Sequence, residues 1–410
     1  MTPDVLDARK AIEALRSGVP SRTALKELGS TDTDLIDVFM SRLECVRNAK
    51  GTEPLGYQAP FGQGKTHLLI QLRTLAEEAG FATSVVVVSP ETPLGNPVAV
   101  LAEISRNASV ADKLGNALRE LLPSARTGTD EWASLRIWAT EAEIVQRFQA
   151  LMFLYEEYSA DTEFQAKILE DIQGKPMTQA EINHALKEID QRAAYNLRGT
   201  PPLRALAPER IRVLARWFRA YRRHGLVVFF DELERLGSFS QKQRMLAYEQ
   251  IDWWTRITRE DGSALLPVWF TTDDLAAITE KDERGVASEL FGGLSDSESK
   301  TSIAERQAAS PRWRGIQALS NLSLLEPPDV HALRALQTRL AELYGRAYSI
   351  ERISDLEIQS QPSSIREEIR RWIAYWDMER LYPGYVPDIA LHAVGEDSTG
   401  EWSGDEANEE

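Results

Sequence analysis

The feature that most constrains the fold is a glycine-rich stretch at residues 59–66, which reads Ala-Pro-Phe-Gly-Gln-Gly-Lys-Thr. Gly62 and Gly64 have no Cβ, so the backbone can curl closely around the oxygens of a bound phosphate. Lys65 supplies a mobile cation, and Thr66 supplies a hydroxyl for Mg²⁺ at the start of a helix whose N-terminal dipole favours an anion. These residues in this order predict a phosphate-binding loop.

One position departs from the phosphate-loop pattern, because Ala59 stands where the pattern has glycine. The alternative interpretation is a chance glycine-rich turn before a helix. The strand and helix predicted on either side favour the phosphate loop. We therefore expect this segment to bind a nucleoside triphosphate, with contacts from Ala59, Pro60, Phe61, Gly62, Gln63, Gly64, Lys65, Thr66 and His67.

The residues around the loop predict a βαβ unit. Residues 55–57 form the strand that enters the loop, residues 66–79 an amphipathic helix, and residues 84–88 a buried strand. This spacing implies a parallel sheet with right-handed crossovers, so the predicted fold class is α/β. Ser89 and Glu91 follow the second strand at the edge where ligands bind, and they either form a turn or hydrogen-bond a catalytic carboxylate there.

A second motif completes the predicted site. Residues 226–230 are continuously apolar and end in Asp231 and Glu232, which indicates a buried strand with two carboxylates at its tip. An apolar strand that ends in aspartate is common and often means only that a strand meets a loop. Following a phosphate loop, however, Asp231 is expected to hold Mg²⁺ through water and Glu232 to polarise the attacking water.

The next predicted strand, residues 265–272, ends in Thr271 and Thr272. We expect this strand to lie beside the Asp231 strand. One of the two threonine hydroxyls would then contact the γ-phosphate or the attacking water. Threonine at a strand end is also commonplace, so this assignment rests on the neighbouring motifs.

Composition limits the class of protein and its compartment. A chain of 410 residues with a net charge of −16 is expected to form two or three domains and not to coat nucleic acid, so any DNA contact would need a local basic patch. Cys45 is the only cysteine, which excludes an intramolecular disulfide and agrees with a reducing compartment. The sequence has no signal peptide and no apolar run near the ~20 residues of a membrane helix, so we expect a cytoplasmic protein without membrane contact.

Most of the remaining chain is predicted to be helical. The pattern indicates helices in residues 4–48, 98–224, 240–258, 329–348 and 364–381, with single helices expected over 132–158, 178–195 and 207–223. Aromatic residues of the long helical insertion, including Trp132 and Trp138, fall at helical spacing without interleaved cations and are interpreted as its own core. Residues 280–314 are polar and are predicted to form a mobile loop carrying Arg284, Arg306, Arg312 and Arg314.

Several of these segments carry a family resemblance. They are residues 59–66, residues 85–94 with Ser-Pro-Glu-Thr-Pro-Leu at 89–94, residues 227–234, Leu-Glu-Pro-Pro at 325–328, and Ile-Glu-Ala-Leu-Arg-Ser-Gly-Val-Pro at 12–20. In these motifs, which spread over most of residues 8–382, the chain resembles the ATP-binding protein of BREX-type bacteriophage-exclusion systems. That family belongs with the AAA+ ATPases of the origin-recognition type, so the resemblance implies an AAA+ core and a helical lid.

The resemblance also implies roles for arginines. In that type a Gly-Asp-x-Arg segment opens a lid helix and its arginine senses the γ-phosphate; this chain reads Ser-Ser-Ile-Arg at 363–366, which keeps Arg366 but not the glycine or the aspartate. AAA+ sites also borrow an arginine from a neighbouring subunit, for which Arg284, Arg312 and Arg314 are candidates. Too few residues follow 381 for a winged helix, which argues against an autonomous DNA-binding module.

The expected organisation follows from these assignments. It comprises a helical lead-in (1–50), an AAA+ nucleotide-binding core (51–110 and 203–325), a helical insertion (111–202), a helical lid (326–390) and an acidic disordered tail (391–410). The expected function is a Mg²⁺-dependent ATPase that acts as a switch or motor in phage defence, as a homo-oligomer or with other defence proteins. The alternative is an assembly protein that binds ATP with little or no hydrolysis; a small-molecule kinase fits poorly because no acceptor-site motif is present.

Overall fold

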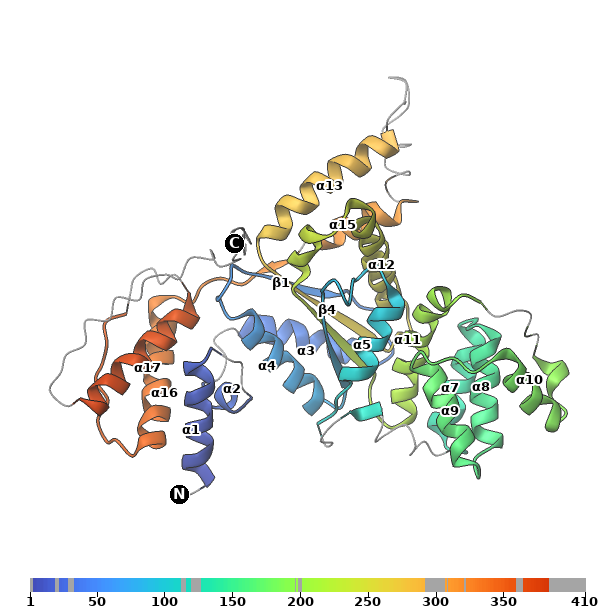
Figure 1. Cartoon of the computed structure of the whole chain (residues 1–410), viewed down its shortest axis with the longest axis horizontal. Helices are drawn as coiled ribbons and strands as arrows, with labels where there is room; N and C mark the ends of the chain where they lie inside the picture. The colour runs from blue at the N-terminus through green and yellow to red at the C-terminus, as the bar shows by residue number, and fades with distance from the viewer. Residues whose placement is uncertain are drawn as a thin grey trace, which may run out of the picture. The chain divides into compact units, whose positions relative to one another are not determined.

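The computed structural model describes residues 3–18, 22–28, 33–111, 116–118, 127–195, 197, 201–291, 307, 309–320, 322–358 and 364–382. The chain packs as two compact units. One comprises Met1–Thr31, Phe61–Gly64 and Pro327–Glu410, and the other comprises Asp32–Pro60 and Lys65–Glu326. Figure 1 shows the elements of both units. Among the described residues, no helix is long and apolar enough to cross a membrane.

The larger unit is built on a parallel sheet, as predicted. Its strands lie in the order β2-β3-β4-β1-β5, and each neighbouring pair is parallel. The expected strand entering the loop, the two buried strands and the strand ending in threonine are all present. The strands are β1 (Leu55–Gln58), β2 (Ala82–Val87), β3 (Leu226–Asp231), β4 (Leu265–Thr271) and β5 (Ser323–Leu324).

Both faces of the sheet are covered, which explains the continuous apolar run of β3. Val227 and Phe229 pack with α3 (Thr33–Arg47) and α4 (Lys65–Glu78), whereas Val228 and Phe230 pack on the opposite face. That second face is covered by α5 (Pro97–Asn107), α11 (Leu203–Ala220) and α12 (Gln241–Arg259), as Figure 1 shows. Successive side chains of a strand alternate between faces, so both sets must be apolar.

A group of short helices follows α5 in the same unit: α7 (Asp130–Glu141), α8 (Gln146–Glu157), α9 (Thr162–Ile172), α10 (Gln179–Glu188) and the 3₁₀ turn η2 (Arg192–Ala194). The single helix predicted over 132–158 is wrong, because the chain turns between α7 and α8. Glu143 adopts a left-handed backbone there, with φ of 51°, and no glycine or proline announces the turn. The helix expected over 178–195 likewise ends early and continues as η2.

A buried ion cluster joins two of these helices, α8 and α9, to α11. Asp171 of α9 is fully buried and pairs with Arg147 of α8 and with Arg210 of α11, whose Nη2 lies 3.0 Å from Asp171 Oδ1. The backbone N–H of Met177 also donates to Asp171 Oδ2 at 2.8 Å. Each carboxylate oxygen therefore has at least one charged donor, as a buried carboxylate requires.

The mobile loop predicted over 280–314 is wrong for the residues that the structure describes. α13 (Asp274–Phe291) and α15 (Pro311–Leu319) occupy much of this stretch, while Arg306 lies outside the described residues. Asp282 of α13 is buried and accepts hydrogen bonds from Arg244 Nε at 2.6 Å and from Tyr248 O–H at 2.8 Å, both in α12. The polar sequence is ordered by these tertiary partners, which local pattern does not reveal.

The smaller unit contains α1 (Pro3–Arg16), α2 (Arg22–Leu28), α16 (Val330–Tyr348) and α17 (Ile365–Leu381), close to the helices expected there. Its apolar core includes Ile12, Leu340 and Trp372. Asp377 of α17 accepts a hydrogen bond from Arg16 Nε at 3.0 Å and from Tyr344 O–H at 2.7 Å, which ties α1 to α16 and α17. The predicted acidic tail lies outside the described residues.

Candidate functional site

The predicted phosphate loop connects β1 to α4. Ala59 is buried, and its N–H donates to the carbonyl of Thr271 in β4 at 3.2 Å. Gly62 and Gly64 have φ of 79° and 92°, which L side chains rarely adopt, whereas Ala59 is not among the residues with positive φ. The loop thus uses glycine where the backbone needs it and tolerates the methyl group of Ala59.

Lys65 is the first residue of α4, and its ammonium group lies over its own loop. Nζ donates to the carbonyls of Ala59 at 2.7 Å and Pro60 at 3.1 Å. Thr66 is half-buried in the first turn of α4. The structure therefore places the predicted cation and hydroxyl at a helix N-terminus, where the dipole favours anions.

Asp231 is the last residue of β3 and has an unusual electrostatic environment. The pKa of its carboxyl group is raised to about 6, chiefly by burial and also by the nearby carboxylates of Glu232 and Glu234, whereas the backbone N–H of Glu232 and the charge of Lys65 lower it. The backbone N–H of Glu232 donates to Asp231 Oδ1 at 2.9 Å. Residues from two distant segments of the chain, Lys65 and Asp231, are thereby brought within electrostatic reach of each other.

Glu232 combines a strained backbone with a charged partner. It adopts the left-handed conformation, with φ of 60° and ψ of 41°, immediately before the 3₁₀ turn η3 (Leu233–Ser238). Its carboxylate forms an ion pair with Arg235, one turn along the same segment. Non-glycine residues in this region cost free energy and cluster at functional sites. Sequence reasoning missed Arg235, although its position three residues after Glu232 was a usable signal.

The two threonines at the end of β4 make contacts inside the protein. The Thr271 hydroxyl donates to the carbonyl of Thr272 at 3.1 Å, and the Thr272 hydroxyl donates to Asp274 Oδ2 at 3.3 Å. The backbone N–H of Thr272 donates to Glu234 Oε2 at 3.1 Å. β4 pairs with β3, as expected, so Glu234 links the end of β4 to the segment that carries Glu232.

Ser89 and Glu91 form a turn after β2, which is one of the two roles predicted for them. Ser89 and Thr92 exchange backbone hydrogen bonds of 3.3 and 3.1 Å, and the Ser89 hydroxyl oxygen accepts a bond from Thr92 N–H at 3.2 Å. The pKa of Glu91 is lowered by its own backbone N–H, by the Ser89 hydroxyl and by Arg235. Within the part of the chain that the structure describes, neither side chain forms a hydrogen bond with Glu232.

The smaller unit includes the loop segment Phe61–Gly64 together with the start of α17. Arg366 lies over the Phe61 ring, with its Cζ 5.0 Å from the ring centroid, and its backbone N–H donates to the Gly62 carbonyl at 3.4 Å. A Cβ at Gly62 would come within 2.7 Å of the Ser364 side chain. The close contact and the positive φ are therefore two separate reasons for glycine at this position. Phe61 is 65% exposed. Arg366 forms no ion pair with any described residue.

The three remaining arginine candidates differ in how they are held. Arg314 donates to Asp252 Oδ1 at 2.6 Å, and Arg312 donates to Glu249 Oε1 at 2.9 Å. Arg284 is 74% exposed on α13 and, among the described residues, pairs only with Glu280, one turn earlier, at 3.3 Å. Arg284 is therefore the candidate whose guanidinium is most available to another molecule.

Comparison with known protein families gives a match over part of the chain. Residues 5–128 match the family model described as BREX system ATP-binding protein BrxC/D. The resemblance expected from the sequence is confirmed over this segment, which includes the loop, α4 and β2 but neither Asp231 nor Arg366. The description of this family is that of an ATP-binding protein of BREX systems. Neither curated proteins nor solved structures give a match.

Proposed function

We propose that this protein is a Mg²⁺-dependent ATPase of AAA+ type that acts as a switch or motor in a bacterial anti-phage system. The observation that carries the proposal is the grouping of Lys65, Asp231 and Glu232 at the carboxyl edge of a parallel sheet. Ligands of open α/β sheets bind at this edge. The family match of residues 5–128 supports ATP as the ligand.

The loop would bind the triphosphate through backbone N–H groups and Lys65. Bound phosphate oxygens would replace the carbonyls of Ala59 and Pro60 as acceptors for the ammonium group, because a charged acceptor makes the stronger hydrogen bond. The helix dipole of α4 would add to this attraction. The residues proposed to contact ATP are those predicted from the sequence, from Ala59 to His67.

Mg²⁺ suits the residues at the end of β3. The ion binds through one or two protein oxygens together with phosphates and water, and Thr66 and Asp231 would supply those oxygens. Asp231 is half-buried close to two further carboxylates, so a divalent cation would offset the repulsion among these negative charges. The described residues contain no group of three or more side chains that could hold a metal alone.

Glu232 would orient and polarise the attacking water, and Thr271 or Thr272 would contact the γ-phosphate or that water. The Glu232 carboxylate already has Arg235 as a partner, so water must share or displace that ion pair. Arg366 would sense the γ-phosphate through its contact with Phe61 and the Gly62 carbonyl. If Arg366 has this role, Arg366→Ala should reduce the rise in melting temperature that an ATP analogue gives to the parent.

An assembly protein that binds ATP and hydrolyses it little is the second candidate. The Glu232–Arg235 ion pair favours it, because a carboxylate held by a guanidinium polarises water less effectively. Single-turnover cleavage of ATP separates the two functions. Release of phosphate within one enzyme equivalent supports the ATPase, and stable bound ATP supports the assembly protein.

The proposed site would be completed by another subunit. An arginine supplied in trans can contribute ~10³-fold or more to turnover by neutralising charge on the γ-phosphoryl group, and Arg284 is the most exposed candidate. Partners would be further copies of the chain or other phage-defence proteins in the cytoplasm, with DNA bound only through a local basic patch. ATPase rate against protein concentration, with and without duplex DNA, tests these expectations. Turnover proportional to concentration down to a monomer contradicts the shared site.

The direct test of the proposal is Lys65→Ala. The variant loses the loop's cation, so ATP binding should fall below detection in equilibrium dialysis. Lys175→Ala is the matched control, because Lys175 is 75% exposed in the helical group and pairs only weakly with Glu170. Retained ATP affinity in Lys65→Ala would reject the phosphate-loop assignment.

A further inference from the structure

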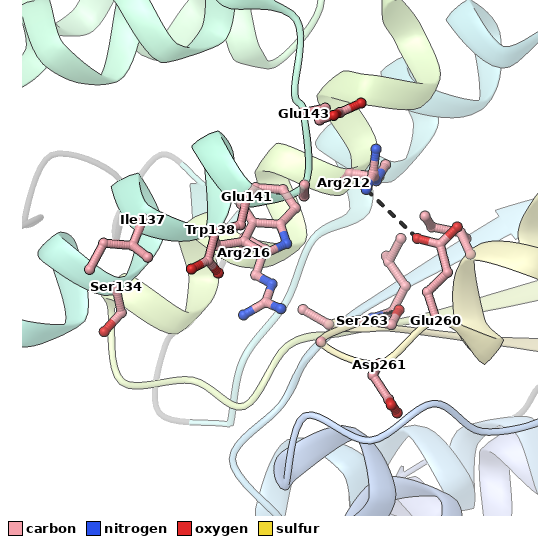
Figure 2. A pocket seen from close by; sticks show the side chains of 15 residues that line it. Ser134, Ile137, Trp138, Glu141, Glu143, Arg212, Arg216, Glu260, Asp261 and Ser263 are labelled. Carbon is pink, nitrogen blue, oxygen red and sulfur yellow. Dashed lines mark hydrogen bonds and ion pairs between the residues drawn. The ribbon is translucent and has the colours of Figure 1, made fainter.

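A hollow of about 810 Å³ lies at the opposite edge of the sheet from the candidate ATP site. α7, α11 and the segment that leads into β4 line it, as Figure 2 shows. Leu265, at the amino end of β4, borders the hollow, whereas Thr271, at the carboxyl end, belongs to the candidate site. The two residues are six positions apart along the strand, or roughly 20 Å, so the hollow is a distinct place for a ligand.

Arg216 is the unusual residue of this hollow. Its guanidinium lies over the indole of Trp138, 5.0 Å from the ring centroid, and both side chains face the hollow in Figure 2. Its Nε is buried without a hydrogen-bond partner, and no described carboxylate pairs with it. Burial, followed by repulsion from Arg219 and Arg212, lowers the pKa of Arg216 to about 9, so the group is still charged at neutral pH.

Two other arginines on the same helix have hydrogen-bond or ion-pair acceptors, which Arg216 lacks among the described residues. Arg212 lies over the same indole at 5.8 Å, yet it pairs with Glu209 at 3.2 Å and with Glu260 at 3.8 Å. Arg219 donates to the backbone carbonyls of His224 and Ser263 at 3.0 and 3.1 Å. A half-buried guanidinium group whose buried Nε has no such acceptor favours an anion from outside the chain.

The acidic residues that line the hollow, called its rim below, limit which anion it can bind. Four acidic residues line the hollow; Glu260 is paired with Arg212, and Asp261 accepts a hydrogen bond from Gly51 N–H at 3.0 Å. Glu141 and Glu143 form no ion pair with the described residues. A phosphate group carries up to two negative charges and would be repelled by this rim, whereas a carboxylate carries one. The two unpaired acids would instead attract a cationic group on the same ligand.

We propose that this hollow binds a ligand that carries one carboxylate beside a cationic group. Arg216 is the partner of the carboxylate, with the Trp138 indole as its platform, and Glu141 and Glu143 are the partners of the cation. The same chemistry occurs in a free zwitterion and in a polypeptide segment with an acidic residue near a lysine. The proposal is independent of the ATPase proposal, because the site uses none of the residues assigned to ATP.

The test is a titration of the full chain with two probes, 6-aminohexanoate and the blocked peptide acetyl-Lys-Gly-Glu-amide, followed by the indole N–H resonance of Trp138. Both probes should shift it saturably. Arg216→Gln should weaken binding roughly tenfold or more, the scale of a lost charge-assisted hydrogen bond. Arg106→Gln, a variant of an arginine that is 70% exposed on α5, should leave binding unchanged. Tighter binding of the peptide identifies a polypeptide source, and tighter binding of 6-aminohexanoate identifies a small molecule.

A second variant keeps the proposal testable if Arg216→Gln fails to fold. Glu141→Gln should weaken 6-aminohexanoate but strengthen acetate, because it removes a partner of the cation and a repeller of the carboxylate. Phosphate should bind more weakly than acetate. Equal or tighter phosphate binding, no saturable shift with either probe, or unchanged affinities in Glu141→Gln would each overturn the proposal.

Discussion

Asp171 is a fully buried aspartate and Asp231 a half-buried aspartate of the larger unit, and their surroundings are opposite. Asp171 is fully buried among helices and lies against two guanidinium groups, from Arg147 and Arg210. Asp231 lies at a strand end close to two more carboxylates, and burial raises its pKa to about 6. Burial alone therefore does not identify a functional acid. What distinguishes Asp231 is that two carboxylates act on its charge and that, among the described residues, it forms no ion pair like those of Asp171, with Lys65 as the cation that lowers its pKa.

This difference separates a structural cluster from a candidate metal site. Ion pairs inside proteins are rarely a net source of stability, but removing one partner is strongly destabilising because it leaves a buried charge unpaired. A cluster of like charges has the reverse property, since removing one member relieves repulsion. The two aspartates should thus respond to the same substitution in opposite ways.

The largest expected effect is on stability in the helical group. Asp171→Asn leaves Arg147 and Arg210 without a buried counter-charge and should lower the free energy of unfolding by about 3–5 kcal/mol. Urea denaturation measures this change. The neighbouring Glu170→Gln is the control, because Glu170 is 56% exposed and its loss should cost no more than about 0.5 kcal/mol. Equal effects of the two substitutions would show that the cluster is not structural.

A somewhat smaller effect is expected on catalysis at the end of β3, where Asp231 and Glu232 lie. Glu232→Gln keeps the shape of the side chain but cannot polarise water, so turnover should fall by roughly 10²-fold or more while ATP binding is kept. Phosphate release under saturating ATP measures this loss. Arg235→Gln is the informative companion, because it frees the Glu232 carboxylate and should raise turnover or leave it unchanged. Parental turnover in Glu232→Gln would make Glu232 structural.

Asp231→Asn should leave stability equal or higher, in contrast to Asp171→Asn. The folded-state pKa of Asp231 lies above the ordinary value of 3.8, so at pH 7 its ionisation opposes folding, on the order of 2 kcal/mol. The same variant should lose the Mg²⁺-dependent part of ATP affinity, measured by titration with and without EDTA. Marked destabilisation by Asp231→Asn would contradict the distinction between the two regions.

The smallest expected effect is a pH dependence. A carboxyl group with a raised folded-state pKa contributes stability while it is protonated, so the free energy of unfolding should fall as pH rises from about 4 to about 6 and then level off. Mg²⁺-dependent ATP affinity should change in the opposite direction and weaken below about pH 6, because the protonated group no longer attracts the ion. Both trends should vanish in Asp231→Asn; trends that persist there belong to other groups.

The sequence predicted the sheet, and with it the strand ends that carry the candidate site residues, more fully than the helices. Residues 59–66 and the run ending in Asp231 are local patterns with a direct physical cause, and the strands around them formed as expected. The helical state of α13 depends on Asp282 meeting Arg244 and Tyr248 of α12, residues that lie 38 and 34 positions away. The cations over Trp138 come from α11, so no interleaved pattern near Trp138 announced the hollow. Both features, the helix α13 and the hollow beside Trp138, depend on contacts between segments that are distant in the sequence.

The left-handed backbone of Glu232 affects which variants would be enriched when the protein is selected in the laboratory for thermostability. Glycine and asparagine adopt this conformation with less strain than glutamate, so Glu232→Gly and Glu232→Asn should relax the turn after β3. Neither residue carries a carboxylate. A screen that rewards heat resistance alone would therefore enrich these variants and discard hydrolysis, and a thermostable form of this protein must be selected under a demand for turnover.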